Sequence, residues 1–321
     1  MLGRKPAFAD SCSCMLSILY GNIRGDFLAK IAVELERALA HRTVNGFTGE
    51  AKRRVLGSGE GWEVADVICT SGPQDRRFEE QHSRVSIAIV AAGSFQYRSG
   101  RSQQLMTPGS VLLGYPGQWF ECGHEHCAGD RCLSFRYDSD YFERLTVDVG
   151  RRTGKPDFKV LRLPPLRALT PVVARTFAGV IGVTDVSWEE VGIQLAAKVL
   201  NLLAGQFVDS DSLPASSVAR VTRVVHAIED RSNNELGLTE LAKHAGLSPY
   251  HFLRTFERLT GVTPHQYVLR ARLRAAALRL CSDTDRVLDI ALDAGFGDVS
   301  NFNRTFKNEF GVSPRVYRRA R

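Results

Sequence analysis

The 321-residue sequence predicts an α+β protein of two domains, in which a strand-rich domain with flanking helices precedes an all-α double helix-turn-helix domain. Three observations predict this order. A helical module occurs twice within residues 238–319, short strands with tight turns fill residues 53–137, and a polar stretch without periodicity lies between these regions. The expected organisation is a poorly defined extension at 1–50, a first domain at 51–208, a linker at 209–217 and a second domain at 218–321.

The repeat in the second domain is defined by two short motifs. Phe-x-Arg-Thr-Phe begins at Phe252 and again at Phe302, and Gly-Val-[Thr/Ser]-Pro-x-x-Tyr begins at Gly261 and again at Gly311. A repeat of roughly 50 residues is typical of a duplicated supersecondary unit. A plain helical bundle with an internal duplication would not explain why the Arg-Thr-Phe motif keeps its register in both copies.

Each copy carries the local signals of two short helices joined by a tight turn. In the first copy, apolar residues at helical spacing end at Gly246, where a glycine lets the chain leave the helix, and Ser248 with Pro249 starts the next helix. The second copy makes its turn at Gly295. The aromatic residues that the second helices are expected to bury are Phe252, Phe256, Phe302 and Phe306. A unit of this kind places its second helix in the major groove of DNA.

Between the two units, residues 265–280 are rich in alanine, leucine and arginine, which are strong helix formers. About 17 residues at ~1.5 Å each would give a rigid strut of roughly 25 Å. Such a strut can hold the two second helices near one helical repeat of DNA apart, ~34 Å. One chain could then bind two consecutive major-groove segments on the same face of the duplex.

The module resembles the DNA-binding domain of the AraC/XylS family of bacterial transcription regulators over Leu238–Arg319, about a third of the chain. The second copy carries most of the resemblance, with Asp289-Ile290-Ala291, Gly295-Phe296, Phe302-Asn303-Arg304-Thr305-Phe306-Lys307 and Gly311-Val312-Ser313-Pro314-x-x-Tyr317-Arg318. The resemblance implies a sequence-specific transcription regulator, here an activator, that binds double-stranded DNA and contacts RNA polymerase. It implies base-facing positions at Tyr250, Leu253, Arg254, Val299, Ser300, Asn303 and Arg304, with Arg258 and Lys307 one turn further on at phosphates.

The charge distribution agrees with a nucleic-acid partner. The formal net charge is +7, and the chain from Pro214 onward holds 17 basic against 11 acidic residues, a net charge of +6. The first 213 residues hold 25 basic against 24 acidic residues. A basic domain favours polyanions through counterion release, although many domains of other function carry a similar charge.

The strand patterns of residues 53–137 predict a sheet domain. Val85-x-Ile87-x-Ile89 alternates, residues 94–98 and 101–105 predict a hairpin around Ser99-Gly100, and another strand follows at 111–114. This order of strands and turns resembles the cupin-type sensor barrel that precedes the DNA-binding domain in many AraC/XylS members. The resemblance implies a small-molecule effector.

A cupin-like barrel also raises the possibility of a metal-dependent enzyme, because some cupins hold a metal on a His-x-His pair and a later histidine. Here His82 is followed by Arg84 at the second position, and Phe120 stands where the later histidine is expected. The incomplete ligand set argues against a dioxygenase or isomerase, and we expect no enzymatic activity.

A cysteine- and histidine-rich segment gives a different metal candidate. If residues 122–126 form a strand, Cys122, His124 and His126 share one face, and Cys132 on a return strand adds a fourth donor. Thiolates and imidazoles suit zinc or copper. The alternative is a polar hairpin with solvated histidines and small buried cysteines, and the spacing matches no standard zinc motif.

Two apolar stripes at helical spacing lie within residues 166–208. The first comprises Leu169, Val172, Val173, Phe177, Val180 and Ile181, and the second comprises Trp188, Val191, Leu195, Val199, Leu202 and Leu203. They could cap the core of the barrel or form an antiparallel contact between two chains. The family resemblance favours the second interpretation, a homodimer.

The N-terminal 50 residues contain few signals. Residues 31–39 predict one amphipathic helix, and Cys12 and Cys14 are expected to lie in a poorly ordered extension. The apolar run at 15–20 is too short to span a bilayer, so no membrane association and a cytoplasmic location are expected. Cysteines in a cytoplasmic chain do not imply structural disulfides.

Four functions therefore remain open. The preferred one is an effector-responsive regulator, and the first alternative is a metal- or redox-responsive regulator that uses Cys122, His124, His126 and Cys132. A metal-dependent cupin enzyme with a DNA-binding appendage would show bound stoichiometric metal and turnover. A constitutive DNA-binding protein whose first domain only dimerises would show no ligand-dependent change in occupancy.

Overall fold

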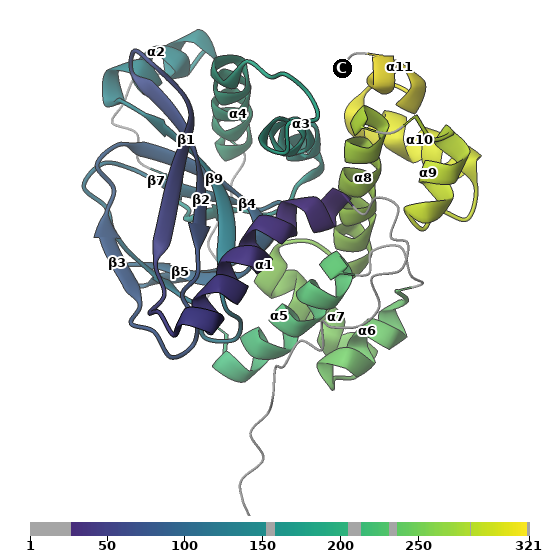
Figure 1. Cartoon of the computed structure of the whole chain (residues 1–321), viewed down its shortest axis with the longest axis horizontal. Coiled ribbons are helices and arrows are strands. Elements are labelled where there is room, and N and C mark those ends of the chain that lie inside the picture. The colour runs from purple at the N-terminus through teal and green to yellow at the C-terminus, as the bar shows by residue number, and fades with distance from the viewer. Residues whose placement is uncertain (1–26, 152–157, 205–212, 231–235, 283, 320–321) are drawn as a thin grey trace, which may run out of the picture.

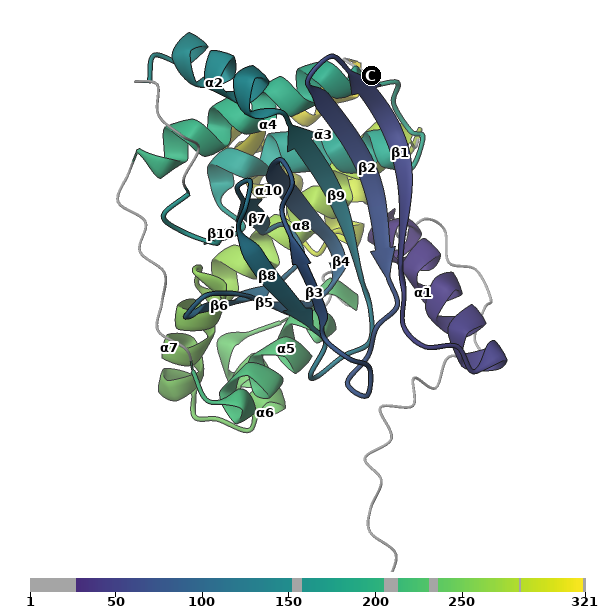
Figure 2. The ribbon, with the colours of Figure 1, turned by 90° about the vertical axis from the view of Figure 1, so that its left-hand side faces the viewer.

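The computed structural model describes residues 27–151, 158–204, 213–230, 236–282 and 284–319, and Figure 1 shows a strand-rich domain beside a helical one. The strands form two antiparallel sheets (Figure 2). The larger sheet has the order β1 (Ala51–Gly59), β2 (Trp62–Cys69), β9 (Asp130–Tyr137), β4 (Val85–Gly93), β7 (Val111–Gly114) and β10 (Arg162–Leu163). The smaller sheet has the order β3 (Phe78–Gln81), β8 (Trp119–Gly123), β5 (Phe95–Ser99) and β6 (Ser102–Met106). The expected cupin-like barrel is confirmed.

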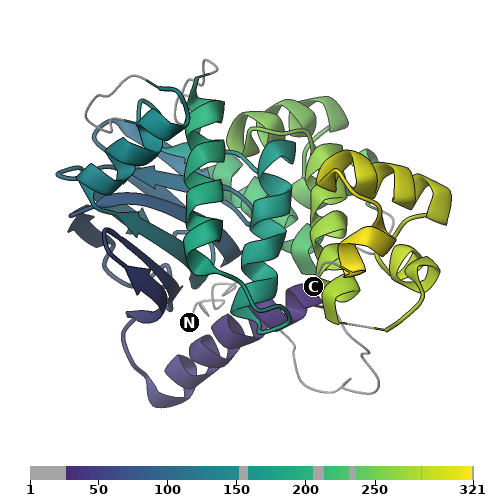
Figure 3. The ribbon, with the colours of Figure 1, turned by 90° about the horizontal axis from the view of Figure 1, so that it is seen from above.

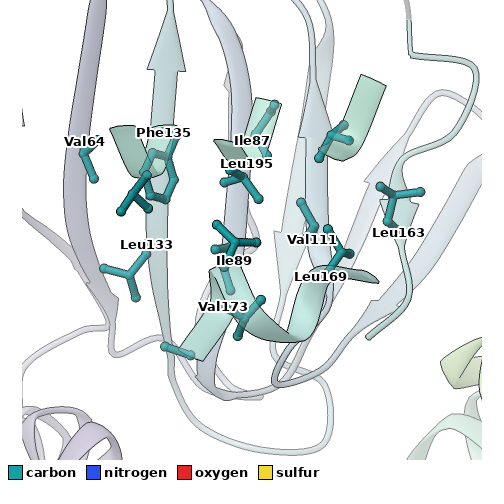
Figure 4. Close-up of a cluster of buried hydrophobic side chains, with 14 of the residues drawn as sticks. Val64, Ile87, Ile89, Val111, Leu133, Phe135, Leu163, Leu169, Val173 and Leu195 are labelled. Atoms are coloured by element: carbon teal, nitrogen blue, oxygen red, sulfur yellow. The ribbon is translucent and has the colours of Figure 1, made fainter. Parts of the chain in front are cut away.

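Strand β4 contributes to two cores because its side chains alternate between the faces of the larger sheet. Ile87 and Ile89 point toward the helices α3 (Thr170–Val180) and α4 (Trp188–Leu203), as Figure 4 shows. Ala88 and Val90 pack instead with apolar residues of the smaller sheet. The alternation that predicted this strand therefore separates a helix-facing core from the interior of the barrel.

Most residues of the two apolar stripes are buried within the chain, which favours the interpretation that the stripes cap the core, while the expected dimer stays a prediction. Leu169, Val173, Phe177, Val191 and Leu195 are at most 1% exposed and belong to the core beneath the larger sheet. Figure 3 shows α3 and α4, the helices that carry most of the two stripes, between the strands and the second domain. The helix α2 (Ser139–Asp148) and the 3₁₀ turn η1 (Arg167–Leu169) complete this cover. A side chain packed on its own sheet is not available to a second chain.

The first helix, α1 (Phe27–Asn45), packs on the first domain although its residues were expected to be a poorly defined extension. Ile31 and Leu35 are buried in the main core, and the side chain of Arg131 donates a hydrogen bond of 2.7 Å to the Ile31 carbonyl. The helix also packs against α5 and α8 of the second domain. The amphipathic helix expected at 31–39 is confirmed and is longer than its pattern indicated.

The second domain follows the predicted order of helices. They are α5 (Ala215–Asp230), α6 (Leu238–Ala245), α7 (Pro249–Thr260), α8 (Pro264–Ser282), α9 (Val287–Asp293), α10 (Val299–Phe310) and α11 (Pro314–Arg319). Helix α8 separates two small cores, one with α5, α6 and α7 and the other with α9 and α10. Its residues are buried on nearly all sides because both helix-turn-helix units use it as a wall.

Two expectations fall on residues outside the described ranges. Cys12 and Cys14 precede residue 27, and the first four residues of the linker expected at 209–217 fall in the gap at 205–212. Helix α5 begins at Ala215, within the predicted linker. Among the described residues, no helix has the length and apolar character needed to cross a membrane.

Candidate nucleic-acid interface

The turn of the first unit is set by backbone conformation and capping. Gly246 ends α6 in the left-handed region with φ of 64°, which a residue with a side chain rarely adopts. The Ser248 hydroxyl then accepts a hydrogen bond from the backbone N–H of His251, and Pro249 is the first residue of α7. Phe252 and Phe256 are fully buried against the neighbouring helices. These features fix the direction in which α7 leaves the domain.

The second unit repeats this design with a different cap. Gly295 has φ of 81°, and the Asp298 carboxylate accepts a hydrogen bond of 2.7 Å from the backbone N–H of Asn301. Phe302 and Phe306 are fully buried, with ring centroids 5.4 Å apart. Aromatic residues at i and i+4 therefore anchor α10 as they anchor α7, where the centroid separation is also 5.4 Å.

The outward faces of α7 and α10 contain every residue that the sequence assigned to DNA. Tyr250 is 62% exposed. Leu253 and Val299 are half-buried at the edges of the two faces. The other exposed members are Arg254, Arg258, Ser300, Asn303, Arg304 and Lys307. Their contact with DNA stays a prediction. A residue must be accessible to solvent to contact DNA, and the positions of these residues meet that requirement.

The two central arginines are oriented by neighbours on their own helices. Arg254 donates a hydrogen bond of 3.1 Å to the Tyr250 hydroxyl, and its guanidinium carbon lies 5.8 Å from the centroid of that ring. Arg304 donates a hydrogen bond of 3.4 Å to Oδ1 of Asn301. Asn301 is exposed and was not among the predicted site residues. Its position three residues before Arg304 is the signal that could have identified it.

Helix α8 links the two units as the predicted strut. Its 19 residues would extend about 28 Å at ~1.5 Å per residue. Two ion pairs tie it to neighbouring helices: Arg274, buried in the middle of α8, pairs with Glu229 of α5 at 2.9 Å, and Arg279, in its last turn, pairs with the exposed Asp293 of α9 at 2.7 Å. The separation between α7 and α10 is therefore held by packing and by charge.

A segment of the first domain, residues 162–170, holds the C-terminal ends of both second helices. Arg162 donates a hydrogen bond of 2.7 Å to the Leu259 carbonyl in the last turn of α7. Arg167 donates to the Asn308 carbonyl of α10, and the Thr170 hydroxyl donates to the Glu309 carboxylate at 2.7 Å. Cations beside helix C-termini are also favoured by the helix dipole. The contacts join residues about 100 or more positions apart, so sequence spacing gave no signal of them.

His82 and Phe120, which stand at positions compared with the cupin metal ligands, contact each other. The His82 ring stacks on Phe120 with centroids 4.2 Å apart, and its Nε2 forms a hydrogen bond of 2.8 Å with the Tyr97 hydroxyl. Burial, with a smaller contribution from the charge of Arg136, lowers the pKa of His82 to about 4. His82 is therefore neutral at pH 7 and has an aromatic partner.

The cysteine- and histidine-rich segment does not form the strand that would align its donors. β8 ends at Gly123, so Cys122, His124 and His126 do not alternate along one face. His124 instead donates a hydrogen bond of 2.7 Å to Asp130 at the start of β9. Cys132 lies further along β9 and is buried.

A groove of about 720 Å³ lies between α1, β1, β2 and the end of α3, on the helix-facing side of the larger sheet. Five cationic side chains, Arg37, Lys52, Arg53, Arg54 and Arg131, line it together with two acidic ones, Glu34 and Asp66. Its apolar lining is Val33, Ile68, Val180 and Ile181. The groove combines an excess of positive charge with an apolar wall.

Arg131 and Asp66 form a buried ion pair at the floor of this groove. Nε and Nη2 of Arg131 donate two hydrogen bonds to the carboxylate, at 2.9 and 2.8 Å. Burial raises the pKa of Asp66, but hydrogen bonds from Arg131 and Arg54 outweigh it and hold the pKa below its usual value. The carboxylate is therefore charged and oriented at neutral pH.

Comparison with known proteins adds two family models and several relatives. An AraC-like ligand binding domain matches residues 66–178, and a helix-turn-helix domain matches residues 241–320. The transcriptional activator AarP of Providencia stuartii is 33% identical over 98 residues, which cover 30% of this chain and 73% of that protein. The chain belongs to the AraC family of transcription regulators.

Other relatives differ in how much of the chain they match. The HTH-type transcriptional regulator MtrA of Neisseria gonorrhoeae is 25% identical over 209 residues, which cover 62% of this chain and 65% of that protein. A solved regulator with an AraC-type DNA-binding domain from Chromobacterium violaceum is 28% identical, covers 33% of this chain and 95% of its own, and superposes with a TM-score of 0.31. The chain thus spans just under two thirds of the gonococcal regulator.

Proposed function

We propose that this AraC-family chain is a sequence-specific transcription activator whose α7 and α10 enter two consecutive major-groove segments of double-stranded DNA. The observation that carries the proposal is the pair of exposed second-helix faces, each anchored by a buried phenylalanine pair and joined through α8. Second helices of such units bind in the major groove. The basic charge of the second domain favours a polyanion, and the Providencia relative is named a transcriptional activator.

Arg254 and Arg304 are the proposed guanine readers. Both occupy the third position of the Phe-x-Arg-Thr-Phe motif, so they lie at equivalent places on α7 and α10. Arginine can donate two hydrogen bonds to guanine, and each good bidentate pair contributes ~1–3 kcal/mol of discrimination. Leu253 and Val299 have apolar side chains that suit thymine methyl groups. The remaining proposed base contacts are Tyr250, Ser300 and Asn303.

Arg258 and Lys307 are the proposed phosphate contacts, and the salt dependence of binding tests them. Replacing either by alanine should weaken binding to all DNA sequences and flatten the slope of log affinity against log salt by about one unit. The measurement is a fluorescence-anisotropy titration at several salt concentrations on operator and random DNA. Lys159→Ala, an exposed lysine of the first domain, is the matched control and should leave the slope unchanged. An unchanged slope in the α7 and α10 variants would make both residues solvated surface charges.

The effector is proposed to bind in the groove between α1 and the larger sheet. Its lining favours a small anionic molecule with an apolar part, because five cations outnumber two acidic groups beside Val180 and Ile181. An occupant would contact α1, and α1 packs against both α5 and α8. Ligand binding could thus change the position of the second domain through one helix.

Residues 162–170 are the proposed second route between the domains. Their contacts at Leu259 and at Asn308 and Glu309 act on the C-terminal ends of α7 and α10 together. A shift of this one segment would change the relative orientation of both DNA-binding helices. The segment begins with β10, which pairs with β7 and so connects it to the larger sheet.

The remaining features of the proposal rest on the family resemblance. We propose contact with RNA polymerase, assembly into a homodimer and a cytoplasmic location, where the chromosome is accessible. The apolar faces of α3 and α4 are occupied by the sheet, so a dimer needs another surface. We propose binding without catalysis for the first domain, because His82 is used in stacking and hydrogen bonding with aromatic neighbours.

A further inference from the structure

Three metal-ligand side chains from three separate segments meet at one end of the barrel interior. Cys69 is the last residue of β2, His124 follows the end of β8, and Asp130 is the first residue of β9. One ligand atom of each lies within 4.8 Å of the others. Cys69 and Asp130 are directly paired across the strands, so their side chains project from the same face of the sheet.

A fourth donor lies beside them. The Cys132 thiol donates a hydrogen bond of 3.2 Å to Oδ2 of Asp130, while His124 donates to Oδ1 of the same carboxylate. His124 and Asp130 are 5% and 6% exposed, and Cys132 is also buried. A carboxylate, an imidazole and two thiols are therefore gathered at one place, where three of the four side chains are buried and Cys69 is half-buried.

The backbone around these donors is closely packed, which fixes their positions. Gly129 and Gly93 have φ of 77° and 73°, and a Cβ on Gly93 would lie 2.3 Å from the Gly129 carbonyl oxygen. The Gly129 N–H donates a hydrogen bond of 2.8 Å to the Ser71 carbonyl, just after β2. The loop that carries His124 is thereby held against the end of the strand that carries Cys69.

We propose that Cys69, His124, Asp130 and Cys132 bind one Zn²⁺ ion. Zinc accepts sulfur, nitrogen and oxygen ligands in a tetrahedral arrangement at ~2.0–2.3 Å. Ligands at those distances lie roughly 3.3–3.8 Å from one another, so the His124–Asp130 contact has to open by about 1 Å or less, and the Cys132 thiol has to move toward Cys69 and His124. Softer copper(I) favours an all-sulfur set, and the harder Mg²⁺ and Ca²⁺ favour oxygen, so this mixed set suits zinc best.

The alternative without a metal is a buried His124–Asp130 hydrogen bond beside two inert thiols. That arrangement would satisfy His124. Within the described ranges, however, this histidine is then the only ion-pair partner of the buried Asp130 carboxylate. A divalent cation would neutralise the carboxylate and use both thiols as thiolates. The proposal keeps His124 and Cys132 from the sequence hypothesis and replaces Cys122 and His126 by Cys69 and Asp130.

The site lies beside a contact between the two domains. Asp130 of β9 is paired with Gly93 of β4. Ser94, which follows Gly93, forms a hydrogen bond of 3.0 Å with His226 of α5. On the opposite face of β9, Arg131 holds both Asp66 and the Ile31 carbonyl of α1. A zinc ion that joins β2 to β9 would therefore stabilise the strand on which both contacts depend.

The test is metal binding by the full-length protein purified without an affinity tag. Elemental analysis after equilibration with Zn²⁺, followed by competition with a chromophoric chelator, should give one equivalent per chain in the wild type. Cys69→Ser, His124→Gln, Asp130→Asn and Cys132→Ser should each weaken zinc binding by more than about 100-fold, because loss of an outer-shell partner alone costs 10–100-fold. Cys122→Ser, His126→Gln and Cys281→Ser are matched controls and should bind as the wild type does.

A second readout does not depend on whether the variants fold. Co²⁺ added to the wild-type protein should produce the intense thiolate-to-metal absorption expected of a cobalt ion with sulfur ligands in a tetrahedral zinc site. A wild-type protein without stoichiometric zinc and without this absorption would overturn the proposal. So would folded Cys69 and Asp130 variants that keep full affinity, or loss of binding in the Cys122 and His126 controls alone.

Discussion

Replacing Phe302 by alanine should lower the free energy of unfolding of the second domain by ~3–5 kcal/mol, the usual range for a fully buried phenylalanine. The ring is inaccessible to solvent and lies between Phe296 and Phe306, with centroid separations of 5.1 and 5.4 Å. Truncation removes the apolar contacts and leaves a cavity beneath α10. Because the same ring anchors α10 to α8 and α9, specific DNA binding should fall together with stability.

Urea denaturation followed by circular dichroism measures this loss. Tyr250→Ala is the matched control, since Tyr250 is an aromatic residue on the exposed face of α7 and its replacement should change stability by about 0.5 kcal/mol or less. A Phe302 variant as stable as the Tyr250 variant would mean that α10 is not held by the aromatic core.

Asp66→Asn should destabilise the first domain by ~3–5 kcal/mol, because it leaves the charge of a buried arginine without its carboxylate. Arg131 is 1% exposed and donates two hydrogen bonds to Asp66 and one to the Ile31 carbonyl of α1. Glu63→Gln is the control. Glu63 pairs with Arg53 on the neighbouring strand, but both side chains are partly exposed, so its loss should cost about 1 kcal/mol or less.

The pH dependence of stability gives this ion pair a separate signature. The pKa of Asp66 in the folded chain lies below its usual value because Arg131 and Arg54 outweigh the effect of burial. Its stabilising contribution is therefore complete above the unfolded pKa and is lost as the pH falls through the folded pKa. Wild-type protein should lose stability below about pH 4 more steeply than Asp66→Asn. Parallel curves for the two proteins would contradict this assignment.

Local signals were sufficient for the two helix-turn-helix units. Gly246 and Gly295 adopt the left-handed turn, Ser248 is the N-cap, and the phenylalanine pairs are buried where the spacing predicts. The hairpin of β5 and β6 also follows its Ser-Gly turn. Each of these features depends on residues within about four positions of one another, which is the distance over which capping and turn chemistry act.

Features that depend on distant pairing could not be predicted in the same way. The apolar stripes of α3 and α4 have the same pattern whether they meet a second chain or the larger sheet, so the sequence left both open. The donor cluster depends on the register of β2 against β9, which places Cys69 opposite Asp130. The contacts of Arg162 and Arg167 depend on how the two domains dock. No local periodicity encodes such relations.

Helices α7 and α10 are proposed to bind two separate segments of one DNA duplex. The most direct measurement is binding by wild type, Arg254→Ala and Arg304→Ala to a library in which every operator position is varied. Each variant should relax base preference within one segment, with the two affected segments about 10 base pairs apart, one helical turn, and should lose specific affinity while random-sequence binding changes much less. Loss of preference at the same positions in both variants, or equal losses on operator and random DNA, would contradict the claim.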